Sequence, residues 1–113
     1  MQNLGKNVQV RHVMNAQVAG TTNVTGSEID MQGFDGVMFI ADIGALTASQ
    51  VTKLQAIGSA TSGAEAAFTT DAVTPAMADG DSNKCLVLDV FRPVTRYLKP
   101  VVQRGTANAV SIA

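Results

Sequence analysis

Three oxygen-bearing side chains in the second half of the chain have the spacing of a calcium-binding loop. Asp79, Asp81 and Asn83 occupy alternate positions, so that their oxygens can converge on one cation. The rest of the loop does not fit, because its sixth position is Lys84 instead of glycine and its twelfth is Val90 instead of a carboxylate. We therefore interpret the segment as a polar turn and expect no metal ion.

The other residues capable of catalysis are isolated. His12 is the only histidine, and we interpret it as a partly buried strand residue. Cys85 is the only cysteine; its place in an apolar run predicts a small buried side chain and no internal disulfide. Glu28, Asp30 and Asp35 are typical of a solvated loop, and the glycines form no phosphate-binding loop before a helix. We predict that the protein is not an enzyme and has no cofactor.

The basic residues are concentrated near the C-terminal end. Four of the eight Lys and Arg residues lie between positions 85 and 104. One interpretation is a charged sheet edge that resists aggregation, and the other is a contact surface for an acidic partner protein. We take partner binding as the hypothesis for this set: Arg92, Arg96, Lys99 and Arg104.

The segment that carries these basic residues has the pattern of two β-strands. Residues 85–91 alternate, with Leu86, Leu88 and Val90 on one face, and both faces are apolar enough for a strand buried on both sides. The short connection 92–96 contains a proline and predicts a hairpin turn. Pro100 cannot donate a hydrogen bond, so the second strand is expected at a sheet edge or at a bulge.

The remaining segments also favour strands separated by polar turns. Residues 59–70 are rich in small side chains and are expected to be a loop with one short helical turn. Residues 47–57 fit either a helix or a strand, and we favour a strand because the neighbouring segments are β. The other expected strands are 7–19, 37–43, 73–78 and 107–112.

These elements predict an all-β protein. We expect one domain over residues 1–113, an antiparallel β-sandwich or open, jelly-roll-like barrel of about six to eight short strands. Residues 1–20 form either an extended N-terminal arm or a first strand. The core must be mainly aliphatic, because the chain has four Phe, one Tyr and no Trp.

Composition narrows the possible partners. The net charge of −1 and the charged fraction of 15% argue against direct nucleic-acid binding. The apolar runs are too short to span a membrane as a helix, and the first 20 residues lack the apolar core of a signal peptide, so we expect synthesis in the cytoplasm.

Several segments resemble a family of small virion proteins of tailed bacteriophages and prophages. The similarity begins with the run IDMQGFDGVMF at residues 29–39. It continues through residues 78–93, which end in Phe-Arg-Pro, then Arg96-Tyr97-Leu98, and then residues 104–110. Pro100 departs from the pattern, because relatives have a charged or polar strand residue at that position.

The resemblance implies a structural role at the surface of a phage head. It implies a capsid cement or decoration protein that binds the outer surface of the major capsid protein shell, stabilises the expanded head and forms part of the virion, made in the cytoplasm of a host bacterium. Other copies of the same chain, as a dimer or trimer, are further expected partners. Residues 1–20 and the tip 92–96 are the expected capsid contacts. A head-tail neck or tail-terminator component is one alternative, and a small ligand- or glycan-binding β module is another.

Overall fold

The chain folds into strands connected by loops. The structure is a computed structural model that describes residues 8–46, 51–78, 80–93, 95–104 and 110–112, with the backbone alone at positions 19, 67–71 and 110–112. No helix occurs within these residues, and the described chain has no helix that could cross a membrane. The described strands number nine: β1 (Gln17–Gly20), β2 (Val24–Thr25), β3 (Ile29–Asp30), β4 (Gly36–Leu46), β5 (Lys53–Ser59), β6 (Ala66–Val73), β7 (Cys85–Phe91), β8 (Tyr97–Gln103) and β9 (Val110–Ile112).

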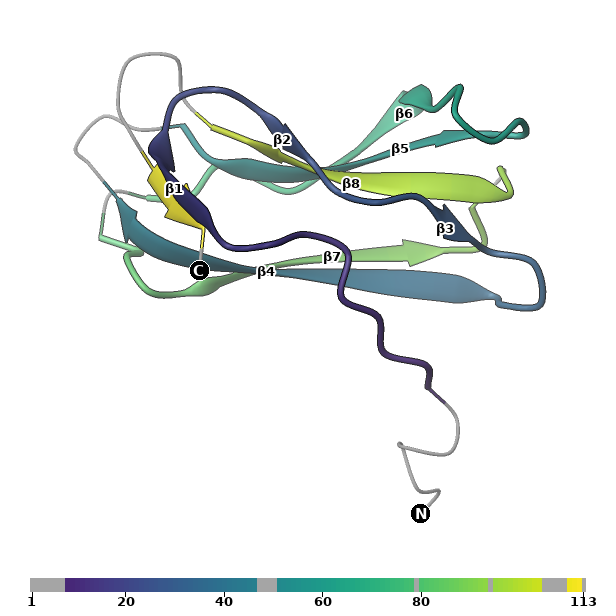
Figure 1. The fold of residues 1–113 in the computed structure, drawn as a ribbon, viewed down its shortest axis with the longest axis horizontal. Coiled ribbons are helices and arrows are strands. Elements are labelled where there is room, and N and C mark those ends of the chain that lie inside the picture. The colour runs from purple at the N-terminus through teal and green to yellow at the C-terminus, as the bar shows by residue number, and fades with distance from the viewer. Residues whose placement is uncertain (1–7, 47–50, 79, 94, 105–109, 113) are drawn as a thin grey trace.

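The strands form two antiparallel sheets that lie face to face (Figure 1). The first sheet has the order β1-β9-β4-β7, and the second has the order β2-β8-β5-β6 with β3 also pairing with β8. This arrangement confirms the prediction of an all-β, single-domain antiparallel sandwich.

Alternation along the strands builds the core between the sheets. In β4 the buried residues Phe39 and Ile43 lie on one face, and in β5 Leu54 and Ala56 do the same. Successive side chains of a strand point to opposite faces, so each sheet contributes one apolar face to the interior. The buried cluster contains Ile29, Met31, Phe39, Ile43, Leu54, Ala56, Met77, Leu86, Leu98 and Val102.

The expected hairpin at the Arg-Pro corner is wrong. Strand β7 pairs with β4, whereas β8 pairs with β5, β2 and β3, so the corner 92–96 carries the chain from one sheet to the other. A short connection can join two strands that pair as a hairpin within one sheet. It can equally join two strands that belong to different sheets of a sandwich. The sequence pattern does not distinguish these cases.

The expectation of an edge position for Pro100 is also wrong. Strand β8 lies inside its sheet, and Pro100 is buried opposite Ala56 of β5. On its other side, β8 pairs with β2 at Val101 and Val102 and with β3 at Tyr97 and Leu98. Pro100 therefore lies opposite the interruption between β2 and β3. At this position the sheet needs no hydrogen bond from residue 100, so the absence of an N–H group costs nothing.

The outer face of the first sheet corrects two further expectations. Residues 86, 88 and 90 of β7 face inward as predicted, but the opposite face is exposed, with Val87 at 50% and Phe91 at 70%. Cys85 is on this outer face and is exposed instead of buried. Both differences have one cause, because no described layer covers this side of the sheet.

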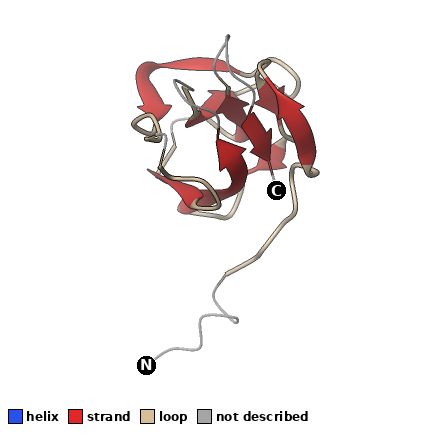
Figure 2. Ribbon diagram, turned by 90° about the vertical axis from the view of Figure 1, so that its left-hand side faces the viewer, coloured by secondary structure: helices blue, strands red, loops and turns tan. Residues whose placement is uncertain are grey.

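The N-terminal segment combines both expected forms. Residues 17–20 form β1, while 8–16 form no regular strand, so the strand expected over 7–19 is too long. Val13 and Met14 pack against the core, and the Val13 carbonyl accepts the Ser27 N–H over 2.7 Å. Residues 8–12, which precede this contact in the chain, extend away from the body of the protein (Figures 1 and 2). His12 lies in this exposed segment and is not a partly buried strand residue.

The middle of the chain follows the prediction in part. Strand β5 confirms the β interpretation of residues 47–57, although 47–50 lie outside the described residues. Residues 66–73 form β6, so the loop expected over 59–70 ends earlier and the strand expected over 73–78 is displaced toward the N-terminus. Strand β9 corresponds to the last expected strand.

Candidate protein-docking site at the Arg-Pro corner

Two backbone hydrogen bonds join the corner 92–96 to the loop 31–35. The Arg92 N–H donates to the Asp35 carbonyl over 2.7 Å, and the Met31 N–H donates to the Arg96 carbonyl over 2.7 Å. Arg92 adopts a left-handed backbone conformation, with φ at 50°, which is uncommon for a residue with a Cβ atom. The corner is therefore held in a specific shape by a segment that is distant in sequence.

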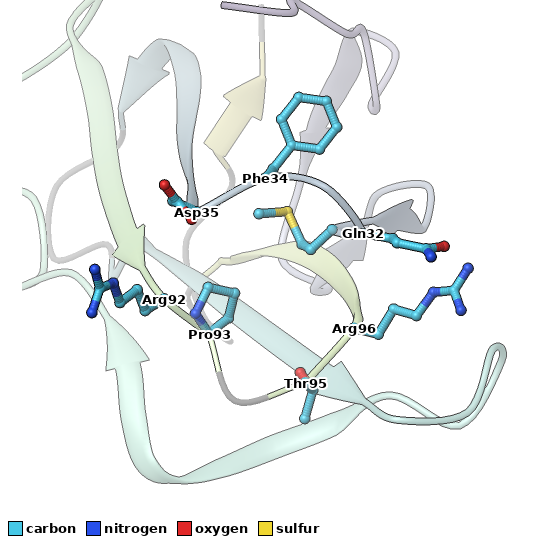
Figure 3. A pocket seen from close by; sticks show the side chains of 8 residues that line it. Gln32, Phe34, Asp35, Arg92, Pro93, Thr95 and Arg96 are labelled. Carbon is cyan, nitrogen blue, oxygen red and sulfur yellow. The ribbon is translucent and has the colours of Figure 1, made fainter.

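An open cleft lies between these two segments. Its volume is about 500 Å³. Figure 3 shows Phe34 above the cleft and Pro93 and Thr95 below it, with Arg92 and Arg96 directed to opposite sides. Phe34 is 50% exposed although it is a large apolar residue. The lining residues are Met31, Gln32, Phe34, Asp35, Arg92, Pro93, Thr95 and Arg96.

Arg92 offers an available positive charge at one side of the cleft. Its side chain is exposed, and the guanidinium carbon lies 5.1 Å from the centre of the Phe91 ring. This cation–π contact orients the group without neutralising it. Arg92 forms no ion pair within the described part of the chain, so its N–H groups can bind an acceptor on another molecule.

Arg96 is held by Asp30 in a two-pronged ion pair. The Arg96 Nε lies 2.8 Å from Asp30 Oδ1, and Nη2 lies 2.8 Å from Oδ2. The hydrogen bond from Arg96, together with one from the Gln32 N–H, lowers the pKa of Asp30 from 3.8 to about 2. Both side chains remain nearly half exposed, at 47% and 43%. Arg96 lines the cleft, and both members of the pair stay accessible to a partner.

Thr95 places a hydroxyl group in the same cleft. Its Oγ1 is buried and makes no hydrogen bond with any residue that the structure describes. A buried hydroxyl that makes no hydrogen bond costs about 1–3 kcal/mol relative to one that does. A partner group that binds this hydroxyl would therefore gain free energy that the isolated protein does not have.

Lys99, another residue of the predicted partner-binding set, is occupied within the fold. Its Nζ lies 3.1 Å from Oε2 of Glu65, whose side chain is only 1% exposed. Glu28 lies beside this pair, accepting hydrogen bonds from the Ser62 hydroxyl over 2.7 Å and from the Gly63 N–H over 2.8 Å. The neighbouring Glu28 carboxyl, the backbone of Glu65 itself and Lys99 together lower the pKa of Glu65. Lys99 therefore stabilises the loop before β6.

Arg104, the fourth member, is buried, with only 8% of its surface exposed. Its Nε donates to the Thr22 carbonyl over 2.7 Å, and its Nη1 donates to the Val18 carbonyl over 2.9 Å. The side chain thus connects the end of β8 to the turn between β1 and β2. We therefore leave Arg104 and Lys99 out of the docking surface and keep Arg92 and Arg96.

The residues with calcium-loop spacing form a turn where the structure describes them. Asp81 Oδ2 accepts the Ala78 N–H over 3.0 Å, and Oδ1 lies 2.9 Å from Lys84 Nζ. Asn83 has φ at 62°, and Asp79 lies outside the described residues. No group of three or more His, Cys, Asp or Glu side chains arranged to hold a metal ion occurs among the described residues.

The sequence pattern identified half of the cleft. It indicated the corner 92–96, with Arg92 and Arg96, but not Phe34 or Asp35, which become neighbours of the corner only through the tertiary fold. The one local signal for Phe34 is a large apolar residue within a Gly-rich turn, which is unusual in a solvated loop.

Comparisons with known proteins returned no match to this chain, whether with protein-family models, with curated proteins or with solved structures.

Proposed function

We propose that this protein is a capsid decoration protein of a tailed bacteriophage, which binds the outer surface of the major capsid protein shell and stabilises the expanded head. The resemblance of residues 29–39, 78–93, 96–98 and 104–110 to small phage virion proteins supports the role. A sandwich with a core shared by both sheets suits it, because a decoration protein needs a rigid scaffold that presents surface loops.

The cleft at the Arg-Pro corner is the observation that carries the proposal. It combines an exposed aromatic ring, a positive charge that forms no ion pair with the described residues and a hydroxyl that forms no hydrogen bond with them. Aromatic and arginine side chains are the residues that most often dominate protein interfaces. A capsid loop with an apolar residue next to a carboxylate would fill the cleft and pair with Arg92.

Binding to the shell would stabilise it by mass action. A protein that binds the expanded shell and not the unexpanded or ruptured one lowers the free energy of the expanded state at every occupied site. Many equivalent sites on one particle add these contributions, so each single contact can be weak. In this mechanism the protein performs no chemical reaction.

The proposal is tested by binding the purified protein to expanded shells of the phage that encodes it. Phe34→Ala and Arg92→Ala should each reduce the bound fraction at least tenfold without changing the circular dichroism spectrum. Lys84→Ala is the matched control, because Lys84 is exposed and pairs only with nearby Asp81. Unchanged binding by both cleft variants would exclude the cleft as the capsid contact.

Quantification of the protein in purified virions tests the role itself. An icosahedral array requires a copy number proportional to the capsid protein, whereas a neck or tail ring requires only a small cyclic number. Absence of the protein from purified particles would contradict the decoration proposal.

A further inference from the structure

The outer face of β4 and β7 carries an apolar surface that no described part of the chain covers. Met38 is 54% exposed and Ile40 is 65% exposed in β4, and Val87 and Phe91 are similarly exposed in β7. Ile40 lies directly opposite Val87 in the strand register. We call these four residues the outer apolar patch. Contiguous exposed apolar surface of this kind usually marks an interaction site.

The charges around the patch are mainly negative. Asp89 lies opposite Met38, and Asp42 lies opposite Cys85, so two carboxylates interrupt the apolar side chains. Arg92 supplies a positive charge at one end of this face, where it lies over the ring of Phe91. If two copies joined these faces around a two-fold axis near Ile40, the carboxylates of both copies would enter one apolar interface, which costs desolvation and repulsion.

The N-terminal arm, residues 8–12, has the complementary properties. Val8 is 49% exposed and Val10 is 89% exposed, while Arg11 supplies a positive charge. The arm leaves its own body on the side of the first sheet and extends away from it (Figures 1 and 2). In an extended chain, alternate side chains are about 6.6 Å apart, which is also the spacing of Met38 and Ile40 along β4.

We propose that the arm of one copy docks on the outer apolar patch of a second copy. Val8 and Val10 cover Met38 and Ile40 along β4, and the long side chain of Arg11 reaches Asp89, which lies beside Met38. The contact is heterologous, since it joins two different surfaces of the same chain, and repetition of it produces a closed ring or an open row of copies. None of the four patch residues lines the cleft of the proposed capsid contact, so this association uses other side chains than that contact.

Cysteine cross-linking tests the contact directly, because Cys85 is exposed at the margin of the patch and is the only cysteine. The variant His12→Cys adds a thiol on the arm at the same alternation as Val8 and Val10. Under mild oxidation in solution, without shells, we expect disulfide-linked dimers and higher species on a non-reducing gel. The variant Ala60→Cys places the second thiol on an exposed bend of the other sheet and should yield none.

Three results would overturn the proposal. Dimers formed equally well by the wild-type chain through Cys85 alone would show that two patches face each other. A disulfide within one molecule of His12→Cys would show that the arm folds back on its own sheet. Absence of any cross-link in His12→Cys at alkaline pH, where the Cys85 thiolate forms in spite of Asp42, would show that the arm does not reach a patch.

A mixing experiment provides a second test that does not depend on oxidation. Arg11→Glu reverses the charge of the arm, and Asp89→Lys reverses the charge beside the patch. Each variant alone should therefore sediment as a monomer at concentrations at which the wild type associates. Their mixture restores opposite charges in both pairings, because the intact arm meets the intact patch and the reversed arm meets the reversed patch, so association should recover. Monomeric wild type at millimolar concentration, or no recovery in the mixture, would contradict the proposal.

Discussion

Gly26 lies against Pro100 at the interruption between β2 and β3. The Gly26 N–H donates to the Pro100 carbonyl over 2.8 Å, and a Cβ atom at position 26 would lie 2.7 Å from Pro100 Cγ and 2.8 Å from the Val13 carbonyl oxygen. Neither neighbour is the end of a flexible side chain, so neither can move away cheaply. Glycine is required here because the backbone of three segments meets at one point.

Gly26→Ala should therefore destabilise the protein. We expect a loss of about 1–3 kcal/mol in the free energy of unfolding, the usual range for an overpacked buried site, measured by urea denaturation. Gly63→Ala is a comparison at a position with open space, where any loss comes from its positive φ alone. A Gly26→Ala protein as stable as the wild type would contradict the close approach of Gly26 to Pro100 and Val13.

The ion pair between Asp30 and Arg96 predicts that the Asp30 carboxyl has a lower pKa than an ordinary aspartate. In the wild type the Asp30 carboxyl should titrate with a pKa of about 2, and in Arg96→Ala the pKa should rise toward 3.8. The measurement is the pH dependence of the side-chain carboxyl chemical shift. Gln103→Ala, which removes a distant side chain, should leave the Asp30 titration unchanged.

This shift has a consequence for stability. Because the pKa of Asp30 is lower in the folded state than in the unfolded chain, the contribution of the pair is complete above about pH 4 and is lost as the pH falls through about 2. The difference in unfolding free energy between the wild type and Arg96→Ala should therefore shrink over this interval. A constant difference down to pH 2 would mean that Asp30 does not carry the effect.

Cys85 should react slowly for an exposed thiol. Its Sγ lies 3.1 Å from Asp42 Oδ1, and the hydrogen bond to this carboxylate raises the pKa of the thiol above 9.0. Asp42→Asn should shift the pH profile of alkylation by iodoacetamide to lower pH, because only the thiolate reacts. Asp89→Asn, on the same face, should have a smaller effect, and identical profiles for all three proteins would refute the role of Asp42.

Arg104 should behave as a structural residue. Arg104→Ala removes the donors to the Thr22 and Val18 carbonyls and deletes a side chain that is itself buried, so we expect a loss of about 1.5–3 kcal/mol in unfolding free energy. Lys84→Ala should cost less than about 0.5 kcal/mol, as is usual for an exposed side chain. Thermal and urea denaturation provide the comparison. If Arg104→Ala instead lowered shell binding with full stability retained, the residue would return to the docking surface.

The sequence pattern alone does not show which of the four basic residues are available to a partner protein. The sequence grouped Arg92, Arg96, Lys99 and Arg104 because they are close together and positively charged. In the structure, Lys99 and Arg104 are bound to the carboxylate or carbonyl oxygens of distant segments, and Arg92 is the member with no ion pair among the described residues. Which cation is available to a partner depends on neighbours that only the fold supplies.

Local periodicity determined the strands of this protein, because a period of two in apolar residues reflects the alternation of side chains along an extended backbone. It correctly placed Leu86, Leu88 and Val90 on one inward face, and it identified an all-β sandwich. The tertiary structure alone decided which strands pair, because pairing depends on the total burial that both sheets achieve together. It placed β7 and β8 in different sheets, put Pro100 at an interruption, exposed Cys85, and brought Phe34 to the Arg-Pro corner.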